Sequence, residues 1–323
     1  MTIIVILFSI LFLITILLWI HDGSRQEMFG IPRHPMDFVT IVFNDPVEIN
    51  LLKIQAISFC FLPEDMVHRI LLCWNDTGSC QEEIIKYYPK KHRSKVQWIH
   101  SGDITGERGW RNQQICKLMI SHTIETTYYI VLDCKNNFIR NISFLDFFSN
   151  EGKPKLFTGN QGIMTSYLDW CCRYFQLDHD STSLPKFSTV TPFVFQTEHV
   201  LKMIRFLEHR EKCSFPEVFF KLQGTEFFLY ITFLVSQDLI VHYEETPKHF
   251  ITVFGDGDKW WNQWDYIDRE LSSGNLSMLG IHRNVLYNMD QEFLDNMLSF
   301  YKTIYPSKKV KVVQRLLHPP YTR

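Results

Sequence analysis

Asp133 stands at the end of an apolar segment, in the stretch YYIVLDCKNNFIRN. Two positions later, where a second acid would complete a pair able to hold a divalent metal, the sequence has Lys135. Mg²⁺ and Mn²⁺ prefer oxygen ligands, and a protonated lysine cannot ligate them. An ammonium group can instead supply positive charge to a bound phosphate. The stretch therefore indicates a metal site, a damaged metal site, or merely the end of a strand.

Three further groups have residue types suited to catalysis or phosphate binding. The segment GERGWRNQQICKL brings Trp110, Gln113 and Lys117 together, and helical spacing places Gln113 and Lys117 on one face. Glu226 lies in the first turn of a predicted apolar helix. Two roles are open for it: a general base, or a carboxylate that interacts with the helix dipole. His282 ends a short apolar strand. Two roles are open for it as well: a metal ligand, or a partly buried structural histidine.

Polar residues also follow several predicted strands. Parallel strands present their carboxyl ends at one edge of a sheet, which is where ligands bind in open α/β folds. One such residue alone is usually a turn former or a helix cap, but several together indicate a polar site. The residues concerned are Asn44, Asp45, Asn75, Asp76, Asp103 and Asp133.

These residues need an α/β fold with a mainly parallel sheet and helices on both faces. Short apolar runs rich in β-branched residues predict strands, and strands that alternate with helices form parallel βαβ units. Thr197 and Thr225 are expected to cap two of the helices. We expect strands at 38–45, 68–76, 96–103, 127–133, 152–159, 190–196, within 251–265 and at 277–284, and helices at 47–60, 110–124, 164–175, 197–210, 224–237 and 290–304.

The N-terminal residues predict a retained membrane anchor. Residues 2–20 carry no charge and would span ~30 Å as a helix, about the thickness of a bilayer core. Arg25 and Arg33 after the span slightly favour a cytoplasmic body, whereas three N-glycosylation sequons would matter only in a secretory lumen. The expected organisation is an anchor at 1–21, a linker at 22–36, one α/β domain at 37–305 and a peripheral tail at 306–323.

Composition and missing motifs exclude several functional classes. The 323 residues include 33 basic and 35 acidic ones, so the overall charge does not favour nucleic acid. The eight cysteines contain no CxxC pair, which argues against structural zinc. The sequence lacks GxxxxGK[ST], GxGxxG, GxSxG and HExxH, which removes the simplest support for P-loop, dinucleotide, serine hydrolase and zinc protease chemistry.

The assembled blocks resemble a GT-A-type glycosyltransferase, and more narrowly a bacterial family of unknown function related to capsule and surface-polysaccharide transferases. The resemblance rests on GWRNQQICKL, YYIVLDCKNNF, VTPFVFQTEHVLKMI, GTEFFLYITF and GIHRN, and it covers roughly residues 37–304. It implies a GT-A-like fold, a nucleotide-sugar donor, a glycan or lipid-linked acceptor and, usually, a divalent metal at an Asp-x-Asp pair. Here Lys135 takes the place of the second acid.

The resemblance leaves three interpretations open. Asp133 keeps Mn²⁺ or Mg²⁺ with help from Asn136 or His282, or Lys135 replaces the metal, or the protein binds a nucleotide sugar without transferring it. The residue roles implied are Glu226 and Lys135 in catalysis; Asp45, Asp76, Trp110, Gln113, Lys117 and Asp133 in donor binding; and Asp133 and His282 as metal ligands.

Overall fold

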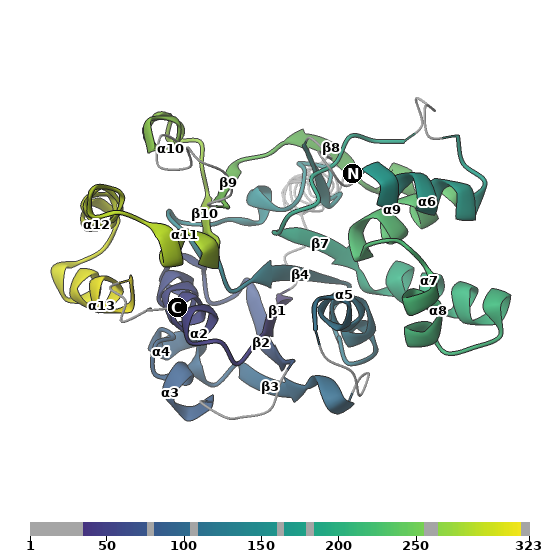
Figure 1. Cartoon of the computed structure of the whole chain (residues 1–323), viewed down its shortest axis with the longest axis horizontal. Helices are drawn as coiled ribbons and strands as arrows, with labels where there is room; N and C mark the ends of the chain where they lie inside the picture. The colour runs from purple at the N-terminus through teal and green to yellow at the C-terminus, as the bar shows by residue number, and fades with distance from the viewer. Residues whose placement is uncertain are drawn as a thin grey trace, which may run out of the picture.

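The computed structural model describes residues 35–75, 81–103, 109–159, 165–178, 184–254 and 264–317 (Figure 1). The expected anchor, Asp76 and the GDGDKWW loop lie outside these residues. Within them, no single helix is long and apolar enough to cross a bilayer; one pair, Phe215–Lys221 with Glu226–Ser236, passes that test jointly but is bent by 102°.

A five-stranded sheet forms the centre of the fold, with the strand order β3-β2-β1-β4-β7. The first four strands run parallel and β7 runs antiparallel to β4, which confirms the expected mainly parallel sheet. The strand order reverses between β1 and β4, and ligands bind at such switch points. The bounds are β1 (Met36–Val42), β2 (Val67–Trp74), β3 (Val96–His100), β4 (Tyr128–Asp133) and β7 (Phe193–Gln196).

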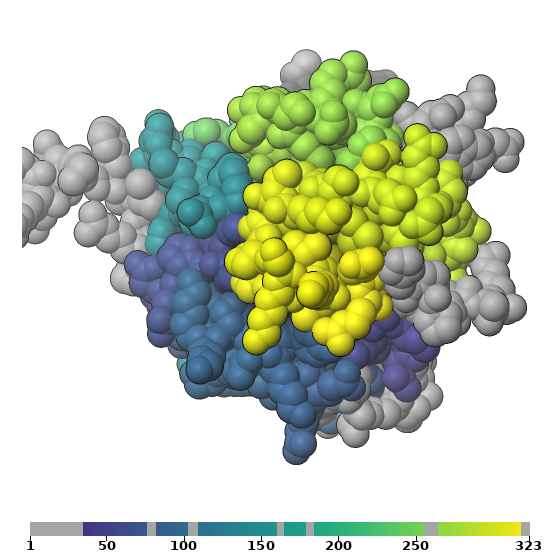
Figure 2. Space-filling model, turned by 90° about the vertical axis from the view of Figure 1, so that its left-hand side faces the viewer, coloured from purple at the N-terminus to yellow at the C-terminus, as the bar shows by residue number. Residues whose placement is uncertain are grey.

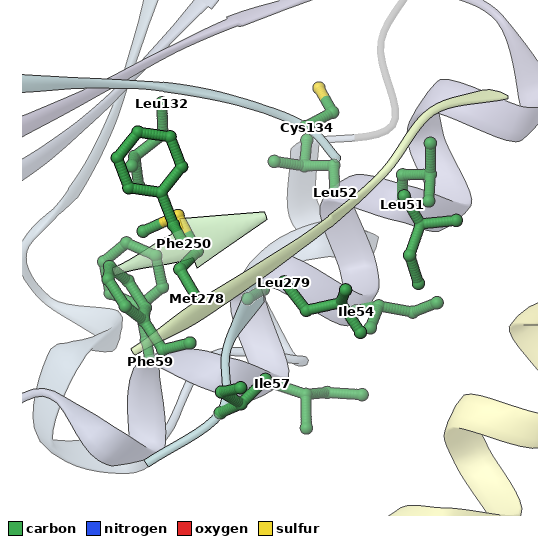
Figure 3. Close-up of a cluster of buried hydrophobic side chains, with 14 of the residues drawn as sticks. Leu51, Leu52, Ile54, Ile57, Phe59, Leu132, Cys134, Phe250, Met278 and Leu279 are labelled. Carbon is green, nitrogen blue, oxygen red and sulfur yellow. The ribbon is translucent and has the colours of Figure 1, made fainter. Parts of the chain in front are cut away.

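Helices cover both faces of this sheet (Figure 1). Successive strand residues point to opposite faces, so Phe38 and Val42 of β1 join one core cluster while Val39 and Ile41 join the other. The first cluster packs on α2 (Pro46–Ser58), and Figure 3 shows its side chains converging there. The short helices α3 (Gln81–Ile85) and α4 (Lys90–Arg93) lie near α2. The second cluster packs on the helices of the other face, which are α5 (Trp110–Met119), α6 (Thr165–Phe175), α7 (Thr197–Glu211), α8 (Phe215–Lys221) and α9 (Glu226–Ser236).

A second, three-stranded sheet lies beside the end of β4. Its order is β5 (Asn136–Phe138), β10 (Met278–Ile281) and β9 (Phe250–Val253), with β10 antiparallel to β5 and parallel to β9. The Ile281 amide donates to the Lys135 carbonyl at 3.0 Å, so the chain after Asp133 is fixed next to the segment that carries His282. Two further strands, β6 (Lys155–Thr158) and β8 (Glu244–Pro247), pair in parallel.

The C-terminal segment differs from the expected peripheral tail. Residues 307–317 form α13 (Ser307–Leu317), which follows α10 (Trp264–Ser272), α11 (Arg283–Asn288) and α12 (Gln291–Ile304). Val310, Val313 and Leu317 are buried in the α2-side core, because their spacing of three and four places them on one helix face. The basic residues between them, which suggested a tail, occupy the other face.

One expected helix cap is also wrong. The residue before α7 is Gln196, and the Thr197 hydroxyl donates instead to the Thr126 carbonyl at 2.7 Å. Thr225 does precede α9, but its hydroxyl makes no capping bond. The first N–H groups of α9 therefore lack a side-chain acceptor.

Candidate active site

A cleft of about 680 Å³ opens at the carboxyl ends of β1 and β4. Residues after both strands line it, together with the first two turns of α5 and the N-terminus of α9. The segment at the start of α11 completes it with His282 and Arg283. Of the polar residues expected at strand ends, Asp133 lines this cleft, whereas Asn44, Asp45 and Asn75 do not.

Lys117 links the two acids of the cleft. Its Nζ lies 3.0 Å from Asp133 Oδ1 and 3.0 Å from Glu226 Oε1, and its side chain is 6% exposed. Lys135 Nζ contacts the other carboxylate oxygen of Asp133. Both oxygens of Asp133 therefore face an ammonium group.

Polar contacts fix the end of β4 on the other side. The Asp133 amide donates to Asn136 Oδ1 at 2.7 Å, and Gln55 Nε2 donates to the Asp133 carbonyl at 2.6 Å. The Thr191 hydroxyl lies 2.9 Å from Asp133 Oδ2 and 2.7 Å from Asn136 Oδ1. Asn136 is thus a structural partner of Asp133, since its side-chain oxygen is already engaged.

Asp133 and Lys117 stay ionised in this cluster. Burial raises the pKa of Asp133, but Lys117 and Lys135 lower it more, so it lies well below its usual range. Burial lowers the pKa of Lys117, but Asp133 and Glu226 outweigh this and hold it above its usual range. Two cations and two anions therefore share a poorly hydrated space, in which each is strongly dependent on its partners.

This arrangement does not fit a divalent metal at Asp133. A cation bound there would have to displace two ammonium groups from the carboxylate or lie next to them. Among the residues that the structure describes, no three His, Cys, Asp or Glu side chains lie close enough to hold a metal ion. His282 lines the same cleft, but its Nδ1 accepts from the Asn284 amide at 3.3 Å and so caps α11.

Glu48 is a cleft residue that the sequence analysis missed. It lies in the first turn of α2, its side chain is 17% exposed, and Arg283 NH1 is 3.9 Å away. Burial raises the pKa of its carboxyl, and Arg283 lowers it less. In the sequence, only its position at the start of the helix that follows β1 indicates a place near the carboxyl edge of the sheet, because no motif surrounds Glu48.

The start of α5 presents the expected side chains and one more. Gly109, with φ 98°, precedes the helix in a conformation that favours glycine. Trp110 lines the cleft and is 51% exposed, and Gln113 lines it as well. Gln114 also lines the cleft; it is 2% exposed, and neither polar atom of its amide group has a hydrogen-bond partner among the described residues.

Asp45, predicted to bind the donor, has a different place. It is the N-cap of α2, accepting from the Val47 amide at 2.9 Å, and is not among the cleft-lining residues. Arg111, which follows Trp110 in α5, donates to the carbonyls at the end of α8. Asp76 falls in the part of the chain that is not described. Glu226 does reach the cleft, as expected, but Lys117 engages its carboxylate.

Comparison with known proteins gives a family and a set of similar folds. A model described as "Family of unknown function (DUF6492)" matches residues 62–265, more than half of the chain. A search of curated proteins found no match.

Solved structures with a similar fold include three glycosyltransferases. WbbM, described as bifunctional, is 11% identical with a TM-score of 0.49, and the match covers 83% of this chain and 51% of WbbM. The galactosyltransferase LgtC, solved with donor and acceptor sugar analogues, is 9% identical with a TM-score of 0.47, and the match covers 88% of this chain and 98% of LgtC. GlyE of Streptococcus pneumoniae TIGR4 is 9% identical with a TM-score of 0.45, and the match covers 87% of this chain and 62% of GlyE. The chain thus spans about half of WbbM. With TM-scores below 0.5 the likeness carries no argument about this chain, so we argue function from the cleft.

Proposed function

The chain belongs to the DUF6492 family of unknown function, and from its cleft we propose that it is a glycosyltransferase that moves a sugar from a nucleotide-sugar donor to a glycan or lipid-linked acceptor. We propose further that Lys135, rather than a divalent metal, supplies positive charge to the donor diphosphate. The observation that carries this proposal is the pair of ammonium groups at Asp133, in a cleft at the carboxyl ends of parallel strands.

The chemistry requires stabilisation of the leaving group. When the bond between the sugar C1 and the β-phosphate oxygen breaks, its electron pair stays on the phosphate, and the acceptor oxygen forms the new bond to C1. Lys135 lines the cleft and can donate to that phosphate, while Asp133 orients it. The N-terminus of α9 faces the same cleft and adds partial positive charge from unpaired N–H groups.

The acceptor hydroxyl must also lose a proton. Glu226 was the first candidate for the base, but its carboxylate holds Lys117, which in turn holds Asp133. We assign Glu226 to this positioning role. Glu48 is the better proton acceptor, since a raised carboxyl pKa lies closer to the neutral range in which general bases work best.

A second function is a non-catalytic module that binds a nucleotide or sugar within a membrane glycan-assembly complex. It is favoured by the same ion pairs, because Asp133 is fully engaged by lysines in the absence of a ligand. In both cases we propose that residues 2–20 anchor the protein in a membrane.

A donor panel tests the proposal and separates the two functions. The full chain in neutral detergent is mixed with UDP-, GDP-, CMP- and dTDP-sugars, and donor binding and nucleotide release are measured with and without sugar acceptors. A transferase releases nucleotide from at least one bound donor. Binding without release across donors and acceptors would support the module, and no binding of any donor would overturn both.

A further inference from the structure

A second cavity, of about 490 Å³, is lined by residues of α3, α4 and α13 and of the segments next to them. Figure 2 shows α13 (yellow) next to the segment of α3 and α4 (blue) on this face. The cavity is independent of the active-site cleft, since no residue lines both. We call it the α13 cavity.

The rim of the α13 cavity is strongly basic. Its charged residues are one acid, Glu83, and five cations: Lys86, Lys90, Arg93, Lys308 and Lys309. The acid is already paired, at 2.7 Å from Lys53. Lys86, Lys90 and Lys308 are exposed, and their ammonium groups form no hydrogen bond or ion pair with other described residues. The rim therefore has a positive charge that nothing in the described chain neutralises.

The wall of the α13 cavity is apolar. Ile57, Tyr87, Pro89 and Val312 line it with carbon-rich surface. Tyr88 lines it too, with its ring centroid 5.2 Å from that of Phe59 in the core. The cavity thus suits an anion with an apolar part.

The position of the α13 cavity relates it to a membrane. The strand β1 begins at Met36, directly after the expected linker, so the chain enters the sheet at its amino edge. The helix α4 ends just before β3 starts, and α2 returns to this edge near Ile57. The cavity therefore lies at the edge where the predicted anchor joins the domain, whereas the cleft opens at the opposite edge.

We propose that the α13 cavity binds the headgroup of an anionic phospholipid at the membrane surface. The phosphate lies among Lys86, Lys90 and Lys308, and the first methylenes of the lipid contact the apolar wall. A basic cluster near a bilayer is attracted to anionic lipids. This site orients the domain so that the cleft faces away from its contact with the bilayer.

Lipid retention by the full chain tests this site. The chain is equilibrated in mixed micelles with equal amounts of phosphatidylglycerol and phosphatidylcholine, and native mass spectrometry counts the lipids that stay bound. We expect phosphatidylglycerol to be retained at least about tenfold more often. The variant Lys90→Glu/Lys308→Glu should lose this preference, and the variant Lys202→Glu/Arg205→Glu, with the same change of charge on exposed positions of α7, should keep it.

Three results would overturn the proposal. Equal retention of the two lipids would remove the role of the anionic headgroup. Unchanged retention in Lys90→Glu/Lys308→Glu would place the lipid elsewhere, for example at the predicted anchor, which both variants share. Displacement of the lipid by inorganic phosphate alone would show an anion site in which the apolar wall contributes nothing.

Discussion

Lys117 is the side chain on which the charge arrangement of the cleft depends most. It is almost completely buried and is the partner of both Asp133 and Glu226. The helical spacing of Gln113 and Lys117 predicted their shared face, and the strand pattern predicted the position of Asp133. The sequence could not show that Lys117 would meet Glu226, because the two are 109 positions apart and only the packing of α5 on α9 joins them.

Replacing Lys117 should destabilise the fold strongly. Lys117→Met removes the buried cation, which leaves the Glu226 carboxylate without a cation and Asp133 with Lys135 alone; breaking such a buried pair typically costs about 3–5 kcal/mol of unfolding free energy. Urea unfolding measures the change, with Lys202→Met on the exposed face of α7 as the control. Adding Glu226→Gln to Lys117→Met should restore part of the stability. A loss no larger than that of Lys202→Met would show that the three charges are not coupled.

Gln114 should show opposite effects on stability and on binding. Its amide lacks hydrogen-bond partners within the described part of the chain, so Gln114→Leu should leave the unfolding free energy unchanged or raise it by about 1 kcal/mol. Donor affinity should fall by about tenfold or more, because a hydrogen bond to the ligand is lost.

Gln55→Leu is the matched comparison for Gln114→Leu. Gln55 is equally buried, but Thr40 donates to its amide oxygen and its nitrogen donates to the Asp133 carbonyl. We expect Gln55→Leu to lower stability in the same urea experiment. If Gln114→Leu lowers it as much, Gln114 has a structural role and not a binding one.

Glu48 should make stability depend on pH. Because folding raises the pKa of this carboxyl, the folded chain keeps a proton that the unfolded chain loses above the ordinary value of 4.5. The unfolding free energy should therefore fall as the pH rises above 4.5, until the folded carboxyl has also lost its proton, and it should stay lower at higher pH. Glu48→Gln should remove that decline, so that it matches the wild type near pH ~4 and exceeds it near pH ~7.

Urea unfolding midpoints measured from pH ~4 to pH ~7 show whether stability falls or rises with pH. Glu82→Gln, at an exposed position of α3, is the control. Wild-type stability above that of Glu48→Gln at neutral pH would mean that Arg283 favours the charged form. If Glu48 is the base, the rate of sugar transfer should also lose its acidic limb in Glu48→Gln.

At the scale of elements, the strands and long helices follow from local pattern. The runs of apolar, β-branched residues predicted the four parallel strands, and helical spacing predicted α2, α5, α7, α9 and α12 to within a few residues at either end. The strand β5 was missed, because Asn136–Phe138 is too short to show a period and is held by β10 from far along the chain. The helix α13 was missed for a different reason: its many lysines hid a narrow apolar face.

The packing of α13 can be tested on that apolar face. Val313 is 0% exposed and lies in the same core cluster as the α2 side chains. Val313→Ala should lower the unfolding free energy by about 1–3 kcal/mol, through lost burial and the remaining cavity. Thermal unfolding measures this, with Lys311→Ala on the exposed face of α13 as the control. Equal midpoints for both variants would mean that α13 is peripheral after all.

At the scale of the whole molecule, two sites lie at opposite edges of one sheet. The cleft lies at the carboxyl edge and contains the groups suited to a donor diphosphate, whereas the α13 cavity lies at the amino edge, where the chain enters from the predicted anchor. The sequence predicted the first edge through its strand ends. It could not predict the second, because α13 lies far along the chain from α3 and α4 and only the fold brings them together.

The dependence of donor turnover on metal and on Lys135 tests the central claim most directly. The rate of nucleotide release by the full chain is measured with a chelator and with Mn²⁺, for the wild type, Lys135→Met and the control Lys202→Met. We predict that the wild type and the control turn over equally in both conditions, and that Lys135→Met is about 100-fold slower, as for the loss of one donor to a developing anion. A wild type that requires Mn²⁺, or a Lys135→Met variant that keeps the full rate, would contradict the account.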